Sequence, residues 1–150
     1  NVNVSRLNKM PHVLSGAGGF IDILSNVRRI IFCGTLTAGG IQTEVGEGRV
    51  KILKEGRVVK WVREIQHRTF DAAFAREKGQ EVIYLTERAV FRPQPGGLVL
   101  TEVAPGIDVV RDIRPVVEFD FRVSPDLKVM DPRLFLPGPM RLKEEEGWRE

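Results

Sequence analysis

The sequence predicts an α/β domain with an open mixed sheet, and three observations support this fold class. The continuous apolar run at residues 30–33 is typical of a parallel strand that is covered on both faces. Between residues 41 and 62, apolar residues instead alternate with polar ones, which indicates an antiparallel meander with one solvated face. Short segments with helical spacing, such as residues 20–27, separate the strands. A mixed order of helices and strands favours an α/β architecture.

Composition excludes several classes of protein. The 150 residues are 42% hydrophobic and 29% charged, which is unlike a disordered chain. The net charge of +3 is too small to indicate nucleic acid binding, and no apolar run reaches the about 18–20 residues of a membrane span. The single cysteine, Cys33, excludes an internal disulfide framework. Because no basic segment precedes an apolar one at the start, we expect no secretory signal and a cytoplasmic location.

The first half of the chain begins with a glycine loop. This loop is expected to lead into a helix and then into a strand that is buried on both faces. Three meander strands follow, separated by glycine turns. These elements are expected at residues 15–19, 20–27, 28–34, 41–45, 50–52 and 58–62.

The second half alternates short helices with strands. A helix is expected between Thr69, as its N-cap, and Gly79, as a left-handed residue at its end. Pro115 is expected to stop a second helix. Prolines and then charges dominate the last 27 residues, which we interpret as an extended tail after a folded part at 1–123. Strands are expected at residues 81–91, 98–103 and 119–123, the second helix at 107–113, and the tail at 124–150.

Candidate chemistry is sparse, and each candidate has a structural alternative. Backbone amides of the glycine loop could converge on an anion or a developing oxyanion, but a tight turn explains the pattern equally well. Cys33 in an apolar strand indicates a buried structural thiol. Arg28 could contact a phosphate or lie at a solvated strand edge, and Glu87 and Arg88 are expected to be exposed strand-end charges. His12 and His67 lack partners at metal-ligand spacing, so no metal is expected.

Several motifs in a fixed order resemble the C-terminal half of the family I coenzyme A-transferases. The resemblance covers roughly residues 1–136 and is closest to the acetate, propionate and 3-oxoacid branch. It implies an open sheet of the NagB/RpiA/CoA-transferase type, with residues 1–123 as part of the catalytic domain. The matching segments are Asn-Val-Asn-Val-Ser at 1–5, Gly-Ala-Gly-Gly-Phe-Ile-Asp at 16–22, and residues 27–35, 37–40, 84–91, 97–108 and 123–125.

The resemblance implies a transferase that moves CoA from an acyl-CoA to a free carboxylate through a glutamyl-CoA thioester. In the family, the nucleophile lies in a Glu-(Ser/Asn/Pro)-Gly motif upstream of the matched region. Glu47, Glu55 and Glu146 precede glycines directly, without the intervening residue, so none receives this role. We therefore expect no catalytic residue in this chain, and no turnover by the chain alone.

The resemblance also implies a site without a resident cofactor, in which CoA is a substrate. Residues around the CoA thioester and acyl group are expected in the glycine loop, and Arg28 near the CoA phosphates. The expected partners are acyl-CoA, carboxylate substrates, an N-terminal remainder of the enzyme and further copies of the chain. Two alternatives remain open: a non-catalytic acyl-CoA-binding or assembly module, and an acyl-CoA hydrolase of the same fold. The loop residues are Gly16, Ala17, Gly18, Gly19 and Phe20.

Overall fold

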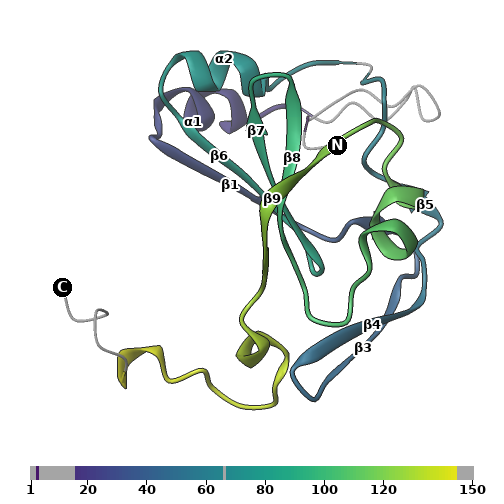
Figure 1. Ribbon diagram of the computed structural model, residues 1–150. Coiled ribbons are helices and arrows are strands. Elements are labelled where there is room, and N and C mark those ends of the chain that lie inside the picture. The colour runs from purple at the N-terminus through teal and green to yellow at the C-terminus, as the bar shows by residue number, and fades with distance from the viewer. Residues whose placement is uncertain (1–2, 4–15, 66, 145–150) are drawn as a thin grey trace.

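A five-stranded mixed sheet forms the centre of the computed structural model, which describes residues 3, 16–65 and 67–144 (Figure 1). The two outer pairs, β1–β6 and β8–β9, are parallel, whereas β6–β7 and β7–β8 are antiparallel. The predicted open mixed sheet is therefore confirmed. In spatial order the strands are β1 (Arg29–Cys33), β6 (Glu81–Leu85), β7 (Ala89–Gln94), β8 (Gly97–Val103) and β9 (Arg122–Val129).

The predicted three-stranded meander is wrong, because its third strand pairs elsewhere. Strands β3 (Gln42–Gly46) and β4 (Arg49–Lys54) form a two-stranded hairpin. Strand β5 (Val58–Val59) instead pairs with β2 (Thr37–Ala38). The cause lies at Gly56, whose amide donates to the Thr37 hydroxyl at 3.0 Å and whose missing side chain lets the two segments meet.

Two short helices, α1 (Phe20–Asn26) and α2 (Ala72–Glu77), lie side by side near β1 and β6 (Figure 1). The N-cap of α2 is Asp71 rather than the predicted Thr69. The Asp71 carboxylate accepts hydrogen bonds from two amides of the first turn, at 2.8 and 3.3 Å, while the Thr69 amide donates to the side chain of Asn3. Gly79 has a φ of +74°, which confirms the predicted left-handed residue.

The two predictions for residues 107–123 need correction. The helical segment is a π-helical turn, η1 (Val109–Ile113), and Pro115 does not stop it but occupies the next turn, the 3-10 helix η2 (Arg114–Val116). A proline is tolerated in the first turn of a helix, where its missing N–H is not needed. The last strand does not end at residue 123, because β9 continues to Val129 and includes Pro125.

Part of the predicted tail belongs to the folded structure. As an edge strand, β9 can contain a proline, and the expected boundary between residues 123 and 124 falls inside it. Two 3-10 turns follow, η3 (Pro132–Phe135) and η4 (Leu142–Glu144). Met130 and Phe135 are buried against Val50 and Val90. Residues 145–150 lie outside the described part of the chain.

The parallel strand β1 is buried on one face only, which contradicts the sequence prediction. Ile30 is 3% exposed in the main hydrophobic cluster, whereas its neighbour Ile31 is 50% exposed. Cys33, predicted to be buried, is exposed because strand alternation directs it to the same side as Ile31. Leu85, the partner of Cys33 on β6, extends this exposed apolar face.

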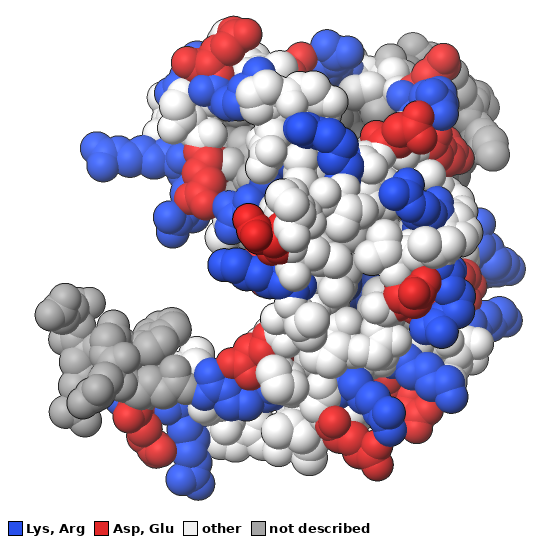
Figure 2. Space-filling model, viewed as in Figure 1, with Lys and Arg blue, Asp and Glu red and all other residues white. Residues whose placement is uncertain are grey.

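The surface seen in Figure 2 carries Lys and Arg side chains interspersed with Asp and Glu, in keeping with the net charge of +3. Among the residues that the structure describes, no helix combines the length and the hydrophobicity that crossing a membrane requires.

Replacing Gly56 by alanine tests the close approach of β2 and β5. The added Cβ would lie 2.3 Å from the carbonyl oxygen of Ala38, so the backbone must move. We expect Gly56→Ala to lower the free energy of unfolding by about 1–3 kcal/mol, the usual cost of overpacking. Gly46→Ala is the matched control, because nothing lies within 4 Å of its added Cβ. If the two variants were equally stable in urea unfolding, this would contradict the close contact between Gly56 and Ala38.

Candidate functional site

A cavity of about 270 Å³ opens at the carboxyl ends of the parallel strands β1 and β6. Ligands of open α/β sheets bind in the crevice outside these strand ends, which makes the cavity the candidate site. Its wall combines aromatic, hydroxyl and glycine residues with one lysine. The lining residues are Phe32, Cys33, Gly34, Thr35, Lys60, Trp61, Tyr84, Leu85 and Thr86.

A larger cavity, of about 770 Å³, lies between the β3–β4 hairpin and η1, away from the strand ends. Four of its six charged wall residues form ion pairs with one another: Arg49 pairs with Glu47, and Arg111 pairs with Asp112. We therefore place the candidate site at the smaller cavity, whose position and wall chemistry both suit a ligand.

Aromatic rings form one side of the cavity. The rings of Phe32 and Tyr84 are stacked with centroids 5.4 Å apart, and Trp61 meets Tyr84 edge-on at 5.8 Å. Burial raises the pKa of Tyr84 to about 12, so its hydroxyl is neutral at physiological pH. The aromatic wall is therefore uncharged, and its rings are packed on one another.

Lys60 brings a positive charge to the cavity. Its ammonium donates to the Thr35 hydroxyl at 3.1 Å, and the Thr35 hydroxyl donates in turn to the Thr37 carbonyl at 2.5 Å. Gly34 faces the ammonium, and a side chain there would come within 3.5 Å of it. Sequence analysis missed Lys60 and Thr35, because the β2–β5 pairing that brings them together leaves no local pattern.

The glycine loop adjoins this cavity through Phe20. The Phe20 ring lies 6.3 Å from that of Phe32, which is part of the cavity wall. The Phe20 amide donates to the carbonyl of Ala17 at 3.0 Å, and Gly18 has a φ of +52°. The loop is solvent-exposed at Gly16, Gly18 and Gly19, and half-buried at Ala17 and Phe20.

Arg28 lies at the opposite end of β1 from the cavity. It is exposed, and its carbonyl accepts a hydrogen bond from the Glu81 amide where β1 and β6 begin. At about 3.3 Å per residue, the strand separates Arg28 from Cys33 by roughly 16 Å. The structure thus places Phe20 against Phe32, one of the lining residues, but places Arg28 away from the cavity.

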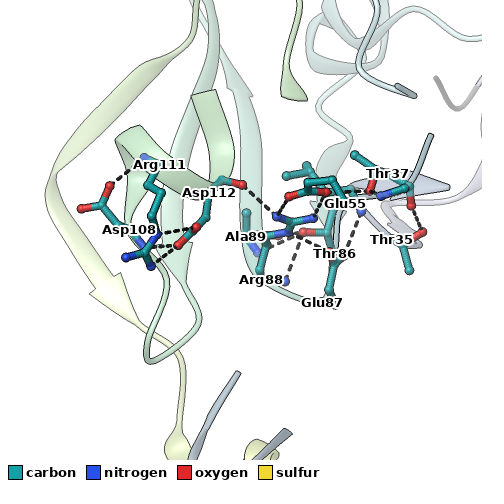
Figure 3. Close-up of polar contacts among 12 residues, drawn as sticks. Thr35, Thr37, Glu55, Thr86, Glu87, Arg88, Ala89, Asp108, Arg111 and Asp112 are labelled. Carbon is teal, nitrogen blue, oxygen red and sulfur yellow. Dashed lines mark hydrogen bonds and ion pairs between the residues drawn. The ribbon is translucent and has the colours of Figure 1, made fainter. Parts of the chain in front are cut away.

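A fully buried arginine, Arg88, lies next to the cavity (Figure 3). Its guanidinium donates to both carboxylate oxygens of Glu55, at 2.5 and 2.9 Å, and to Glu87 at 2.8 Å. It also donates to the carbonyl of Asp112 at 2.8 Å. The expectation that Glu87 and Arg88 are exposed charges is wrong, because two carboxylates and a carbonyl compensate the burial.

The arginine network links three segments, two of which line the cavity (Figure 3). Glu87 also accepts from the amide of Leu36 at 2.8 Å, and Glu55 accepts from the hydroxyl of Thr37 at 2.9 Å. The segment 35–37, the turn before β5 and the turn after β6 are therefore held together by one guanidinium. Thr35 and Thr86, which line the cavity, lie in two of these segments.

The charges in this network stabilise one another. Burial opposes the charge of Arg88, yet its hydrogen bonds to Glu55 and Glu87 hold the pKa of the guanidinium above its usual value. The hydrogen bond from Arg88 holds the pKa of Glu55 below its ordinary value of 4.5. Both groups are therefore charged at neutral pH, and the network is ionic there.

The described residues contain no cluster of three or more His, Cys, Asp or Glu side chains that could hold a metal ion. His67 is exposed, and His12 lies outside the described residues.

Arg88→Met is expected to destabilise the fold, because it leaves the Glu55 and Glu87 carboxylates without their shared cation. Breaking a buried pair costs about 3–5 kcal/mol, and the partial exposure of Glu55 favours the lower end. Arg92→Met is the matched control, since Arg92 is 36% exposed and ion pairs at the surface, such as its pair with Glu81, contribute little to stability. Similar losses in both variants, measured by chemical denaturation, would contradict a special role of Arg88.

The low pKa of Glu55 predicts an acid-sensitive contribution to stability. Because the folded-state pKa is depressed, the contribution is present above the unfolded value of 4.5 and is lost as pH falls through the folded value. We expect the stability difference between the native chain and Glu55→Gln to be largest near pH 7 and to shrink below pH 4.5. A difference that stays constant down to pH 3 would contradict this. Four other carboxyl groups also have a lowered pKa, and both proteins contain them, so their contributions to the pH dependence cancel in the difference. They are Asp71, Glu81, Asp112 and Asp131.

Known CoA-transferases resemble this chain along nearly all of its length, although no family model matches it. The acetate CoA-transferase YdiF of Escherichia coli O157:H7 is 47% identical over 140 residues, which cover 93% of this chain and 26% of that protein. The caffeate CoA-transferase of Acetobacterium woodii is 40% identical over 138 residues, which cover 90% of this chain and again 26% of the relative.

Solved structures agree with this relationship. The apoenzyme of the E. coli O157:H7 acyl-CoA transferase YdiF matches with a TM-score of 0.85 and 47% identity, over 92% of this chain and 26% of that chain. The thioester complex of YdiF with CoA matches with a TM-score of 0.79 and 50% identity, over 82% of this chain and 24% of that chain. The chain thus spans about a quarter of the length of these relatives. Over that quarter, the chain is similar to CoA-transferases in both sequence and fold.

Proposed function

We propose that this chain is part of a CoA-transferase that moves CoA from an acyl-CoA to a short-chain carboxylate or 3-oxoacid through a glutamyl-CoA thioester. The main support is the 47% identity to an acetate CoA-transferase over 93% of the chain. A relative of the same fold forms a thioester complex with CoA, which supports the class of intermediate. In this proposal, the nucleophilic glutamate belongs to a part of the enzyme outside these 150 residues.

The glycine loop is proposed to stabilise the reacting acyl group. Each step of a thioester exchange passes through a tetrahedral oxyanion, and amide donors aimed at such an oxygen typically contribute about 10²–10³ in rate. The loop from Gly16 to Gly19 offers exposed backbone beside Phe20, which touches the cavity wall at Phe32. This contact with the cavity at the strand ends supports the proposed role of the loop.

CoA itself is proposed as a substrate rather than as a resident cofactor. A contact between Arg28 and a CoA phosphate stays a prediction, and it requires CoA to extend along β1 from the cavity. A cytoplasmic location and assembly into a homo-oligomer also stay predictions.

Adduct trapping tests the transferase proposal. We expect the full-length protein that contains this chain, incubated with acetyl-CoA alone, to release acetate and to gain the mass of CoA less one water on a glutamate, because the first half of the exchange needs no acceptor. Cys33→Ser is the necessary control, since dissolved oxygen could oxidise the exposed Cys33 thiol and any free CoA thiol in the acetyl-CoA to a mixed disulfide. Intact mass and peptide mapping identify the modified residue. The 150-residue chain alone should show neither an adduct on glutamate nor CoA exchange.

The same experiment separates the alternatives. A non-catalytic module would bind acetyl-CoA without a glutamyl adduct, and an adduct that vanishes in Cys33→Ser would be a disulfide. Both results would overturn the proposal. A hydrolase would release acetate continuously in the absence of an acceptor carboxylate, whereas a transferase requires the acceptor for turnover.

A further inference from the structure

One face of the parallel strands β1 and β6 is apolar and largely exposed. Ile31 of β1 is 50% exposed and lies beside Ile83 of β6, and the exposed Cys33 lies beside Leu85, which is 38% exposed. Because successive residues of a strand point to opposite faces, these four side chains share one face of the sheet and form what we call the β1–β6 patch. Contiguous exposed apolar surface, when polar groups border it, marks a site of protein contact.

Charged side chains border the β1–β6 patch where the two strands begin. Arg29 of β1 is paired in register with Glu81 of β6, and alternation along the strands places both on the face of the patch. The Glu81 carboxylate accepts hydrogen bonds from Arg29 and, at 2.7 Å, from Arg92 of β7. An apolar centre with a polar rim is the usual anatomy of a protein interface.

Helices cover the opposite face of the same strands. Leu24 of α1 and Ala75 of α2 pack in one hydrophobic cluster with Ile30 and Val82, so both helices lie on that side of β1 and β6 (Figure 1). Parallel strands normally carry helices on both faces, and the uninterrupted apolar run at residues 30–33 is typical of such a strand. The sequence of β1 therefore suits a second covering layer, which the described residues do not supply.

On the face of the patch, the described part of the chain covers β7 and reaches only as far as β6. Val90 of β7 is 5% exposed because it packs with Met130 and Phe135, which follow β9. Ile83 touches this cluster from β6, whereas none of the residues of β1 does. The uncovered strip therefore includes β1, which is the edge strand of the sheet.

We infer that the β1–β6 patch is the surface on which the rest of the enzyme polypeptide docks, and that the docking segment is an amphipathic helix. The inference rests on the proposed function, in which the chain is part of a longer enzyme. The matched region makes up 26% of the curated relatives, so most of such a polypeptide lies outside it. A tethered segment has an effective concentration of the order of millimolar, which favours it over a second copy. Its apolar side covers Ile31 and Leu85, and its polar side chains meet the charged rim.

The docked helix also lies beside the candidate site. Cys33 and Leu85 belong both to the β1–β6 patch and to the lining of the cavity at the strand ends. A helix that packs on the patch therefore brings a part of the enzyme outside these 150 residues to the edge of that cavity.

Thiol labelling measures whether the patch is covered. In the full-length protein with Cys33→Ser, the substitution Ile31→Cys places a thiol within the patch at a position that does not line the cavity. Its reaction with N-ethylmaleimide is followed by mapping the peptide that contains residue 31, in the native state and in urea. We expect native labelling to be at least about tenfold slower, because a covered thiol reacts only after local opening.

Photo-crosslinking identifies what covers the patch. In the full-length protein, Arg29 at the rim is replaced by the photoreactive residue p-benzoylphenylalanine, which leaves the apolar centre of the patch unchanged. We expect a crosslink within one polypeptide, to a peptide outside these 150 residues whose apolar residues recur at helical spacing. Arg49 is the matched control, since its side chain is 64% exposed against 67% for Arg29 and also pairs with a glutamate. The same replacement at Arg49 should not crosslink to that peptide.

Several results would overturn the inference. Native labelling of Ile31→Cys less than about tenfold slower than labelling in urea would show that the patch is open. A crosslink from position 29 to a second copy, or the lack of one to a peptide outside residues 1–150, would exclude the proposed occupant. A crosslinked peptide with strand-like alternation would exclude a helix. If Ile31→Cys fails to fold by circular dichroism, the crosslink decides alone.

Failure of this inference is distinct from failure of the proposed function. A glutamyl-CoA adduct on the full-length protein, together with an open patch, leaves the transferase standing and removes only the docking surface. A covered patch without a glutamyl adduct removes the transferase and leaves the docking surface.

Discussion

The burial of one guanidinium sets much of this structure. Arg88 has no exposed surface, so its buried charge needs compensation. Glu55, Glu87 and a backbone carbonyl provide it by accepting hydrogen bonds from the guanidinium. Among the described residues, no buried side-chain polar atom lacks a partner, so the network is complete. These contacts hold the turn before β5 and the turn after β6 together, and the turn after β6 lines the cavity through Thr86.

The cavity depends on contacts between distant parts of the chain. The pairing of β2 with β5 places Lys60 opposite Thr35, and Gly56 makes that pairing possible. Aromatic contacts run from Phe20 beside the glycine loop through Phe32 to Tyr84, and so couple the loop to the same wall. A positive charge, an aromatic wall and a loop rich in backbone amides thus meet at one edge of the sheet.

Sequence periodicity and glycine turns were sufficient to predict the main strands, the helix after the loop and the fold class. They failed to predict contacts between residues that are far apart in the sequence. Nothing local to Arg88 shows that Glu55 lies beside it, and nothing in β5 shows that it leaves the β3–β4 hairpin. Thr69 and Asp71 are both good N-caps, and only the position of Asn3 decides between them. The resemblance to CoA-transferases was predicted from ordered motifs, whereas the position of Lys60 at the cavity is visible only in the structure.

The strand order also bears on how the chain folds. Strands β6, β7 and β8 follow one another in sequence and pair through tight turns, whereas β1 meets β6 across a separation of 52 residues. Local pairings close small loops, and distant pairings pay a larger entropic cost before their contacts form. The central three strands therefore provide the natural nucleus, and β1 docks late. Since the cavity lies between β1 and β6, the site is completed by one of the last pairings to form and is opened by one of the first to break.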